Sequence, residues 1–309
     1  MQPLKIAIIG FGKIAADQHV PSIAGNSRFE LVASSSRSGT GPQPVFTDWR
    51  ELLRSVKDLD AVAITTPPGP RYDIARECIE AGLQCLLEKP PTVTLAEIDD
   101  LASLAEAKGV TLFTTWHARH NPAVEAAGRL LAGNRVRSMA IRWHENVHKW
   151  HPGQQWIWEP GGFGVFDPGI NAFSIATKIF PGPLFVDHGE LKFPSNSQTP
   201  IAGEMVFKSP VADGPLTCSL DFRWGDEEEW TIDFQTADGT EIRLINGGAK
   251  LFVGGVEQEA AGLGEYPDIY REFAQLIDER KSFVDSSPLR LVADCMMLGR
   301  RTLVDPIYM

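Results

Sequence analysis

The sequence predicts an α/β N-terminal domain built on a doubly wound parallel sheet and an α+β C-terminal domain with a large, mostly antiparallel sheet. From the N-terminus to about residue 120, apolar strand-like runs alternate with helical patterns, which is typical of a parallel sheet. Beyond that point, strand-like runs follow one another through short turns, which favours antiparallel pairing. We expect residues 1–120 and 121–309 to form the two domains, with the last helix packing back on the first.

The first strand, residues 5–9, runs into the glycine-rich sequence Gly10-Phe11-Gly12-Lys13-Ile14-Ala15. In a G-x-G-x-x-A motif the first glycine makes a tight turn, the second admits a pyrophosphate, and the small third residue lets helix pack on strand. The following helix points free N–H groups at the phosphates. Because the motif lies between a strand and a helix, it predicts a Rossmann-type NAD(P) site rather than a plain turn. The contacts would come from Gly10, Gly12, Lys13 and Ile14.

The end of the second strand, residues 29–35, bears on which dinucleotide is preferred. A site that prefers NAD usually has Asp or Glu there, bonded to the ribose 2′-hydroxyl. This chain has Ser36 and Arg37 instead. Arg37 offers a planar cation that can grip a 2′-phosphate, and Ser36 can add a hydroxyl bond. The pattern favours NADP, with NAD as a usable second cofactor; the alternative is a solvated Ser/Gly loop.

Two later strands are predicted to end at the same edge of the sheet as the glycine-rich turn. The run 59–66 ends in Thr65-Thr66-Pro67, and the run 83–87 ends in Glu88-Lys89-Pro90. Open α/β sheets bind ligands at the carboxyl ends of their strands, so we expect these residues to line one crevice with Gly10 and Gly12. The other elements expected here are helices at 72–81 and 95–108 and a strand at 110–115.

Lys89 is the residue in this crevice with the clearest chemical use. Pro90 and Pro91 stop the strand and fix the lysine backbone, and the Lys89–Pro90 peptide is a candidate for cis geometry, which X-Pro bonds reach at low cost. A lysine held in this way can reach a cofactor ribose and a substrate hydroxyl together. The alternative is a surface lysine whose ammonium lies in water.

The second half of the chain predicts a sheet with helices on one side. Asp238-Gly239 indicates a hairpin turn within it. Helices are expected at 121–131, 267–280 and 288–303. Strands are expected at 136–145, 184–193, 201–207, 216–224, 230–236, 240–244 and 250–253.

The segment His144-Glu145-Asn146-Val147-His148 matches the zinc-protease motif H-E-x-x-H. That chemistry needs a helix, on which residues four apart can share one metal. Here the motif continues a strand-like run, and in a strand the two histidines would lie about 13 Å apart, too far for one zinc ion. We therefore expect no metal site.

Aromatic and acidic residues in the following stretch suit a polyhydroxy ligand. Trp143, Trp150, Trp156 and Trp158 cluster in sequence with Glu145, His148 and His151, and rings can cover C–H faces while polar groups bind hydroxyls. Trp143 and Trp158 are expected in the core, and Trp150 is the better ligand candidate. Further on, Asp167 and Asn171 lie four apart at the start of a helix and can face the same side. The alternatives are a helix N-cap for Asp167 and a satisfied polar residue for Asn171.

Composition limits the classes of partner. The net charge of −11 argues against nucleic acid or an anionic membrane. We see no signal peptide and no apolar run near the roughly 20 residues of a membrane span. The cysteines are scattered and are expected to be buried, reduced thiols, which suits a cytoplasmic protein. They are Cys78, Cys85, Cys218 and Cys295.

Taken together, these motifs resemble the glucose–fructose oxidoreductase / inositol dehydrogenase / MocA family (Gfo/Idh/MocA) over essentially the whole chain. The sequence is more similar still to its bacterial L-arabinose and D-galactose 1-dehydrogenases. Three stretches carry that similarity, namely 115–117 (TWH), 150–162 (WHPGQQWIWEPGG) and 164–171 (GVFDPGIN).

The resemblance implies roles for individual residues. Lys89, Asp167 and Asn171 would form the catalytic set, and Ser36 and Arg37 would meet the 2′-phosphate. The sugar would be surrounded by His117, Glu145, Trp150 and Trp230. Many members carry a histidine as general base where this chain has Asn171, and an amide cannot take a proton. We therefore expect Asp167 to be the base, Lys89 to polarise the C1 hydroxyl and Asn171 to orient the sugar. A homodimer through the open face of the second sheet is implied as well.

The expected activity is oxidation of C1 of L-arabinose or D-galactose, and of D-fucose, to the aldonolactone, with hydride transfer to NAD(P). These sugars share their ring stereochemistry and differ at C5, so the sequence leaves their order open. One alternative is an NADP-linked dehydrogenase or reductase of another polyol or an inositol. A second is a nucleotide-binding redox sensor without turnover, which would not need Lys89 and Asp167 together.

Overall fold

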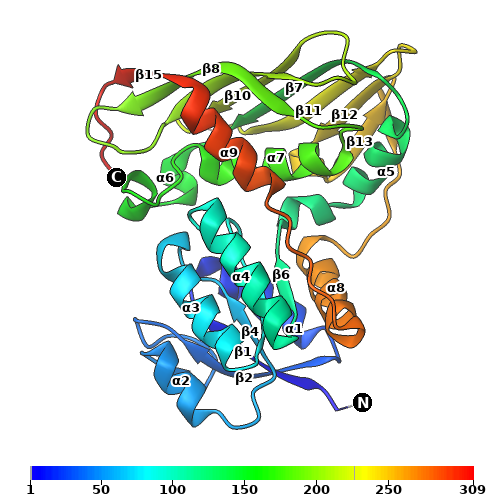
Figure 1. Cartoon of the computed structure of the whole chain (residues 1–309). Helices are drawn as coiled ribbons and strands as arrows, with labels where there is room; N and C mark the ends of the chain where they lie inside the picture. The colour runs from blue at the N-terminus through cyan, green and yellow to red at the C-terminus, as the bar shows by residue number, and fades with distance from the viewer. Residues whose placement is uncertain (1, 226) are drawn as a thin grey trace. The chain divides into compact units, whose positions relative to one another are not determined.

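The computed structural model describes residues 2–225 and 227–309 and divides into two compact units (Figure 1). The first unit contains the chain up to His117 together with Gly264–Ser286, and the second contains Ala118–Leu263 and Ser287–Met309. The change of unit after His117 lies close to the expected boundary at residue 120. The assignment of all of 121–309 to the second domain needs correction, because the segment Gly264–Ser286 belongs to the first unit.

The first unit is built on a six-stranded, all-parallel sheet of order β3-β2-β1-β4-β5-β6, which confirms the predicted doubly wound sheet. The strand order reverses between β1 and β4, and such a switch point is where open α/β sheets bind ligands. The strands are β1 (Leu4–Ile9), β2 (Phe29–Ser35), β3 (Val45–Phe46), β4 (Ala61–Ile64), β5 (Gln84–Leu87) and β6 (Leu112–Thr114).

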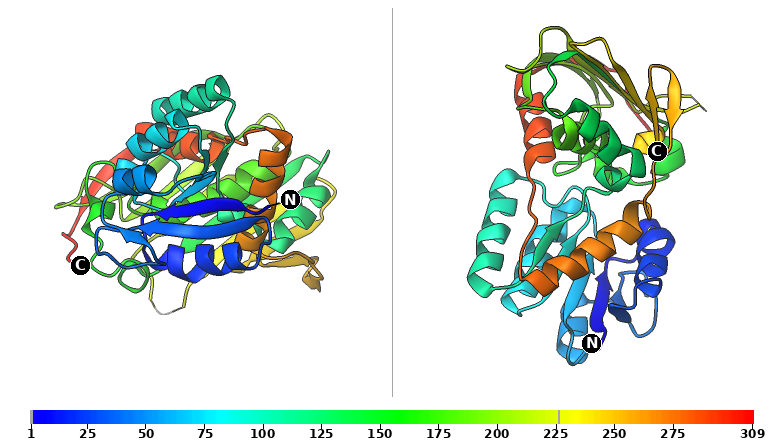
Figure 2. Two further views of the ribbon diagram at one scale, coloured as in Figure 1. Left: turned by 90° about the horizontal axis from the view of Figure 1, so that it is seen from below. Right: turned by 90° about the vertical axis from the view of Figure 1, so that its right-hand side faces the viewer.

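Helices cover both faces of this sheet (Figure 2). Helices α3 and α4 pack against each other, and α1 packs against α8. The capping box at Thr94 and Glu97 starts α4, and Gly109 ends it in the left-handed conformation, as the sequence indicated. The helices are η1 (Ala15–His19, a π-helix), α1 (Val20–Ala24), α2 (Trp49–Ser55), α3 (Pro68–Glu80), α4 (Leu95–Lys108) and α8 (Glu265–Glu279).

Helix α8 returns the chain to the first unit because of its apolar face. Four side chains with helical spacing form this face, and all four are buried in one core cluster with residues of β1. They are Tyr266, Ile269, Tyr270 and Phe273. We expected the last helix to pack on the first domain, but that helix, α9 (Ser287–Leu298), belongs to the second unit.

The second unit contains a nine-stranded sheet of order β14-β13-β12-β11-β7-β10-β9-β8-β15. It is mostly antiparallel, as predicted, although β7 pairs with β10 and β8 with β15 in parallel. The strands are β7 (Val136–His144), β8 (Phe185–Pro194), β9 (Ala202–Lys208), β10 (Leu216–Asp221), β11 (Glu229–Thr236), β12 (Glu241–Ile245), β13 (Lys250–Val253), β14 (Val256–Gln258) and β15 (Gly299–Val304).

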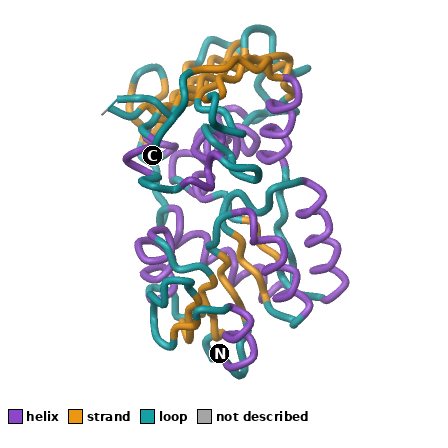
Figure 3. Tube along the Cα trace, turned by 90° about the vertical axis from the view of Figure 1, so that its left-hand side faces the viewer, coloured by secondary structure: helices purple, strands orange, loops and turns teal. Residues whose placement is uncertain are grey.

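Helices α5, α7 and α9 lie along one face of this sheet (Figures 1 and 3). The helical segments of this part of the chain are η2 (His117–His120), α5 (Pro122–Leu131), α6 (Val147–Trp150), η3 (Gln155–Trp158), α7 (Phe166–Ile179), η4 (Asn246–Gly248) and α9. Among residues 2–225 and 227–309, each helix is too short or too polar to span a bilayer. The four cysteines are buried and form no disulfide, as expected.

The final helix is shorter than predicted. The pattern suggested a helix from 288 to 303, but α9 ends at Leu298 and the chain continues as β15. Gly299 lies so close to the preceding turn that an added Cβ would come within 2.6 Å of the Cys295 carbonyl oxygen. The residues of β15 pair with β8 instead, so a contact with a distant strand overrides their local helical pattern.

The assignment of α8 to the first unit can be tested through Phe273, which is fully buried. We expect Phe273→Ala to lower the free energy of unfolding by about 3–5 kcal/mol, because truncation leaves a cavity in that core. Denaturant unfolding measures this value. Gln275→Ala, on the exposed side of the same helix, should change it by less than about 0.5 kcal/mol. Equal effects of the two substitutions would contradict the packing of α8.

Candidate active site

The glycine-rich turn after β1 has the geometry that its motif predicts. Gly10 has φ = 93°, and an added Cβ would come within 2.7 Å of the backbone nitrogen of Thr66. An added Cβ at Gly12 would meet no heavy atom within 4 Å, so open space lies beside this backbone. Ala15 is fully buried in the core of the unit. The turn therefore leaves room for a phosphate group at Gly12, while Ala15 packs the helix on the sheet.

Lys13 and Ile14 follow the turn at the start of the helix. The Lys13 ammonium pairs with Asp17 one turn later, and it is well exposed. The apolar side chain of Ile14 is 38% exposed. Its position beside the open space at Gly12 suits contact with a bound nucleotide.

The end of β2 presents a row of hydroxyl groups next to an exposed guanidinium. The Ser36 and Ser38 hydroxyls lie 2.7 Å apart, and Ser38 lies 2.7 Å from the Thr40 hydroxyl. Arg37 is exposed, and within the described residues its side chain makes no hydrogen bond or ion pair. Hydroxyls and an uncommitted cation at this strand end fit a phosphate on the ribose.

The end of β4 closes against the glycine-rich turn. Thr65 donates its hydroxyl to the Gly10 carbonyl oxygen. The Thr66 hydroxyl is buried and has no hydrogen-bond partner among residues 2–225 and 227–309. Pro67 precedes the first turn of α3. A buried hydroxyl without a partner indicates a ligand position, so the residues present at Gly12, Arg37 and Thr66 fit a dinucleotide.

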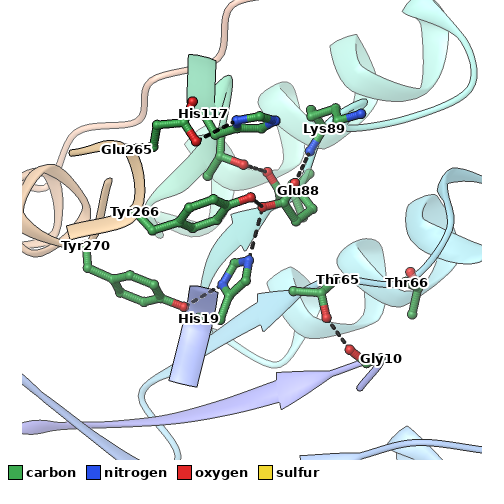
Figure 4. A network of polar contacts seen from close by, with 12 residues as sticks. Gly10, His19, Thr65, Thr66, Glu88, Lys89, His117, Glu265, Tyr266 and Tyr270 are labelled. Carbon is green, nitrogen blue, oxygen red and sulfur yellow. Dashed lines mark hydrogen bonds and ion pairs between the residues drawn. The ribbon is translucent and has the colours of Figure 1, made fainter. Parts of the chain in front are cut away.

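At the end of β5, the Glu88 carboxylate is buried inside the unit (Figure 4). One of its oxygens lies 3.0 Å from His19 Nε2 and accepts a 2.8 Å hydrogen bond from the Tyr266 hydroxyl. The other accepts a 2.9 Å bond from the Lys89 backbone N–H. His19 Nδ1 lies 2.8 Å from the Tyr270 hydroxyl. We call His19, Glu88, Tyr266 and Tyr270 the carboxylate network.

These contacts change the expected role of Glu88. It was expected to contact the cofactor, but the carboxylate lies in the interior and binds groups of its own unit instead. Burial by itself opposes ionisation, yet the hydrogen bond and charge of His19 outweigh it and lower the pKa of Glu88 to about 2. Glu88 is therefore an ionised anchor that holds the Lys89 backbone.

Arg71 fixes the same segment from α3. Its buried guanidinium donates to the backbone carbonyls of Thr66, Glu88 and Pro90. The Lys89–Pro90 peptide is cis, as the sequence suggested. The Lys89 side chain is half-buried and points away from the Glu88 carboxylate (Figure 4). The lysine backbone is thus held on two sides while its side chain extends from the strand end.

His117 extends the carboxylate network at the end of the first unit. Its ring stacks on Tyr266 at 5.8 Å, and its Nδ1 lies 3.1 Å from the Glu265 carboxylate. Burial alone would lower the pKa of His117, but the charge of Glu265 raises it above its ordinary value. Glu265 therefore favours the protonated form of His117.

In the second unit, Asp167 lies in the first turn of α7. Val165 is the N-cap of this helix, so the interpretation of Asp167 as a cap is wrong. The Asp167 carboxylate is buried, and its Oδ2 lies 3.3 Å from His151 Nε2. One turn later, the side-chain amide oxygen of Asn171 is buried with no hydrogen-bond partner in the described chain. This end of α7 thus presents a carboxylate paired with an imidazole and an amide oxygen ready to accept a hydrogen bond.

Glu145, Trp150 and Trp230 form a second polar and aromatic group in this unit. The Trp230 indole donates a 3.0 Å hydrogen bond to the buried Glu145 carboxylate. The Trp150 and Trp230 rings lie 5.8 Å apart. Trp150 is 39% exposed, whereas Trp143 and Trp158 are buried as expected. An exposed ring beside a buried carboxylate is suited to a sugar.

The H-E-x-x-H motif does not form a zinc site. His144 ends β7 and lies 2.9 Å from the Ser219 hydroxyl, whereas His148 is exposed on the short helix α6. The expectation that the whole motif lies in a strand is corrected for His148. In the described ranges, no group of three or more His, Cys, Asp and Glu side chains could hold a metal ion.

Several residues around these features were missed by sequence reasoning. His19, Arg71, Tyr266 and Tyr270 act through contacts that join segments far apart in the chain, and no local pattern marks them. His151 stood in the aromatic stretch, and its pairing with Asp167 depends on the turn between α6 and α7. Two prolines follow Lys89, and this local pattern was the signal that could have pointed to the residues that hold its backbone.

The chain is similar to several known oxidoreductases. Residues 4–116 match the GFO_IDH_MocA model, described as an oxidoreductase family with an NAD-binding Rossmann fold. Galactose 1-dehydrogenase of Pseudomonas fluorescens is 43% identical over 310 residues, covering 100% of both chains. A crystal structure of D-galactose-1-dehydrogenase protein from Rhizobium etli is 45% identical, with a TM-score of 0.93 over 100% of this chain and 99% of that one.

A more distant structural neighbour shares the fold alone. KijD10, a 3-ketoreductase from Actinomadura kijaniata crystallised with TDP-benzene and NADP, is 17% identical. Its TM-score is 0.81, over 98% of this chain and 99% of that one.

The carboxylate network predicts how stability depends on pH. The pKa of Glu88 falls from 4.5 to about 2 in the folded protein, so its stabilising effect is complete above pH 4.5 and is lost as the pH falls toward 2. We expect Glu88→Gln to lower the free energy of unfolding at neutral pH by about 3 kcal/mol. The difference from wild type should shrink across that window. Denaturant unfolding at a series of pH values measures it.

The matched control is Glu77→Gln, which removes an exposed partner of Arg50. It should change the free energy of unfolding by less than about 1 kcal/mol. A difference between wild type and Glu88→Gln that stayed constant through the acid range would contradict the ionised state of Glu88.

Proposed function

The chain belongs to the Gfo/Idh/MocA oxidoreductase family, and we propose that it oxidises C1 of D-galactose or L-arabinose, and of D-fucose, to the aldonolactone with NADP. The enzyme class, a sugar dehydrogenase acting on a CH–OH group, follows from the relatives. The observation that carries the choice of C1 is the full-length similarity, at 43% and 45% identity, to two proteins described as galactose 1-dehydrogenases.

The cofactor would be held by the strand ends of the first unit. Gly12 would admit the pyrophosphate, Thr66 would use its uncommitted buried hydroxyl, and Arg37 would pair with the 2′-phosphate. When bound, the oxidised nicotinamide supplies the acceptor for the hydride that leaves C1. NAD, which lacks the 2′-phosphate, would bind without the contact to Arg37.

Lys89 would act on the C1 hydroxyl as a positive charge. Its backbone is fixed by Glu88 and Arg71, so little rearrangement is needed to bring the ammonium to a bound sugar. A hydrogen bond from the ammonium stabilises the negative charge that develops on the C1 oxygen as its proton leaves.

Asp167 would accept the proton of the C1 hydroxyl. Asn171, on the same side of α7, has an amide that cannot take a proton, but its unpaired carbonyl oxygen can accept a bond from a sugar hydroxyl. We therefore assign the base to Asp167 and the orientation of the sugar to Asn171. Together with Lys89 they form the proposed catalytic set.

The remaining sugar contacts would come from rings and charged groups. Trp150 and Trp230 would cover the C–H faces of the pyranose, while Glu145 and His117 would bind its hydroxyls. The three sugars differ in their substituent at C5, and an apolar pocket discriminates such a group by only about 1–3 kcal/mol. We therefore propose activity on more than one of them. We further propose a homodimer through the sheet face opposite α5, α7 and α9.

The activity is tested by mixing the purified protein with NADP and each of L-arabinose, D-galactose and D-glucose, and following the near-ultraviolet absorbance of the reduced cofactor. We expect turnover with the first two sugars. Lys89→Ala and Asp167→Asn should each lower kcat by about 10²–10⁴-fold, since each removes a group that handles charge in the transition state. Lys108→Ala, at the exposed end of α4, is the control and should behave as wild type.

No turnover with any aldose would contradict the proposal. Turnover only with a polyol or an inositol would favour another dehydrogenase of the same family. Binding of NADP without any reduction would favour a redox sensor.

The cofactor preference is tested through Arg37. We expect Arg37→Ala to raise the KM for NADP by about 10–100-fold, because charge-assisted hydrogen bonds contribute about 1.5–3 kcal/mol. The KM for NAD should stay within about twofold, since NAD carries no 2′-phosphate. Steady-state kinetics with each cofactor gives both values. An equal loss with NADP and NAD would contradict a role in phosphate binding.

A further inference from the structure

We propose that His151 takes the proton from Asp167 during sugar oxidation and releases it to water, which makes it a positioning residue that acts through Asp167. This inference rests on the function proposed above. It is carried by four residues of the second unit: His151 and Gln154 between α6 and η3, Trp156 in η3, and Asp167 in α7.

The two ring nitrogens of His151 face different groups. Nε2 lies 3.3 Å from Asp167 Oδ2, and Nδ1 lies 3.3 Å from Gln154 Oε1. The rings of Phe222 and Trp156 pack edge-on against the imidazole, at 5.8 and 6.5 Å between centroids. Contacts at both ring nitrogens and from two neighbouring aromatic rings therefore fix the orientation of the imidazole.

The contact with Trp156 determines which nitrogen carries the proton. The Trp156 indole N–H can only donate, and it lies 3.0 Å from Gln154 Oε1. The Gln154 atom that faces His151 is therefore the carbonyl oxygen, which can only accept. Nδ1 must then donate to it. Once Asp167 has taken up the proton of the C1 hydroxyl, the neutral ring therefore presents its Nε2 lone pair to the Asp167 carboxyl group. His151 is thus poised to accept a proton from the Asp167 carboxyl group.

The exposed fractions of the two side chains support a route for the proton to solvent. The Asp167 side chain is only 6% exposed, whereas that of His151 is 17% exposed. A proton left on Asp167 would neutralise the base and stop the next turnover. His151 lies between this buried carboxylate and water, next to the exposed residues Pro152 and Gly153.

The steps balance in atoms and charge. The C1–H bond breaks with its electron pair, the hydride would be accepted by the oxidised nicotinamide, and the hydroxyl proton moves to Asp167 as the C1=O bond forms. Asp167 then passes that proton from Oδ2 to His151 Nε2, which restores the carboxylate and forms an imidazolium. The imidazolium releases a proton to water and becomes neutral again.

The charges around His151 set its pH dependence. The carboxylate of Asp167, from α7, stabilises the imidazolium, and the Gln154, Trp156 and Phe222 groups are uncharged. When His151 is already protonated, it cannot take another proton, so kcat should fall on the acidic side of the profile.

The relay is tested by measuring kcat and KM against pH for wild type, His151→Asn and the control His148→Asn, with NADP and D-galactose. His148 is exposed on α6, so its substitution should change nothing. We expect His151→Asn to lower kcat by about 10²-fold, with KM within about twofold, and to remove the acidic limb that belongs to the imidazole. Trp156→Phe keeps a ring but loses the N–H, so it should lower kcat in part.

A second measurement is independent of turnover. Nitrogen-15 NMR of the histidine rings, recorded at a pH at which the ring is neutral and with the His151 signal assigned by its loss in His151→Asn, should show the proton on Nδ1 in wild type and a mixture of tautomers in Trp156→Phe. A proton on Nε2 in wild type overturns the relay. So does an acidic limb that is the same in wild type and His151→Asn, when wild type turns over sugar.

The two proposals fail in distinguishable ways. Wild-type turnover with an unaltered His151→Asn profile overturns the relay alone. A wild-type protein that oxidises no sugar overturns the proposed function and the relay with it. Loss of activity in His151→Asn accompanied by an unchanged pH profile and a raised KM would indicate a merely structural role, and would also overturn the relay.

Discussion

The arrangement of the strand ends in the first unit depends on the buried carboxylate of Glu88 and its hydrogen bonds. An ionised group in the interior is costly unless its partners offset the loss of water. His19, the Tyr266 hydroxyl and the Lys89 N–H supply those partners, and they come from the helix after the glycine-rich turn, from α8 and from the segment that follows β5. One side chain thereby links the helix after the glycine-rich turn to the backbone of Lys89. The segment Gly264–Ser286, which the apolar face of α8 holds in this unit, also supplies the Tyr266 hydroxyl to the carboxylate.

The second unit contains a different arrangement of charged groups. In the first unit the charge on Glu88 is fixed and serves to hold Lys89 in place. In the second, the Asp167 carboxylate faces one nitrogen of an imidazole whose other nitrogen faces Gln154, and the proposed relay would use this pair to carry a proton away. Within the proposed reaction, these two arrangements are complementary, because hydroxyl oxidation needs a fixed positive charge near the oxygen and a base that is regenerated after each turnover.

Local sequence patterns were sufficient for the strand–turn–helix at Gly10 and Gly12, for the alternating elements of the first unit and for most strands of the second. Each of these depends on residues within a dozen positions of one another. The errors arise where distant contacts decide the outcome. Tyr266 and Tyr270 give α8 an apolar face, but nothing in that face says which sheet it covers. Gly299 and its neighbours read as the end of a helix until pairing with β8 is considered. At the site, residue types suggested roles for Lys89 and Asp167, which stay predictions. The contact between Glu88 and His19 could not be predicted locally, because the two residues lie 69 positions apart.

We propose that this protein oxidises C1 of the sugar, whereas a neighbour with the same fold is a 3-ketoreductase. The most direct measurement uses D-galactose with deuterium at C1 and nowhere else. The sugar is mixed with the protein and NADP, and both products are examined by mass spectrometry and NMR. The account predicts that the deuterium is found on C4 of the reduced nicotinamide and that the sugar product has lost it. Reduced cofactor free of deuterium, with the label retained in the sugar, would show that another carbon is oxidised and would contradict the account.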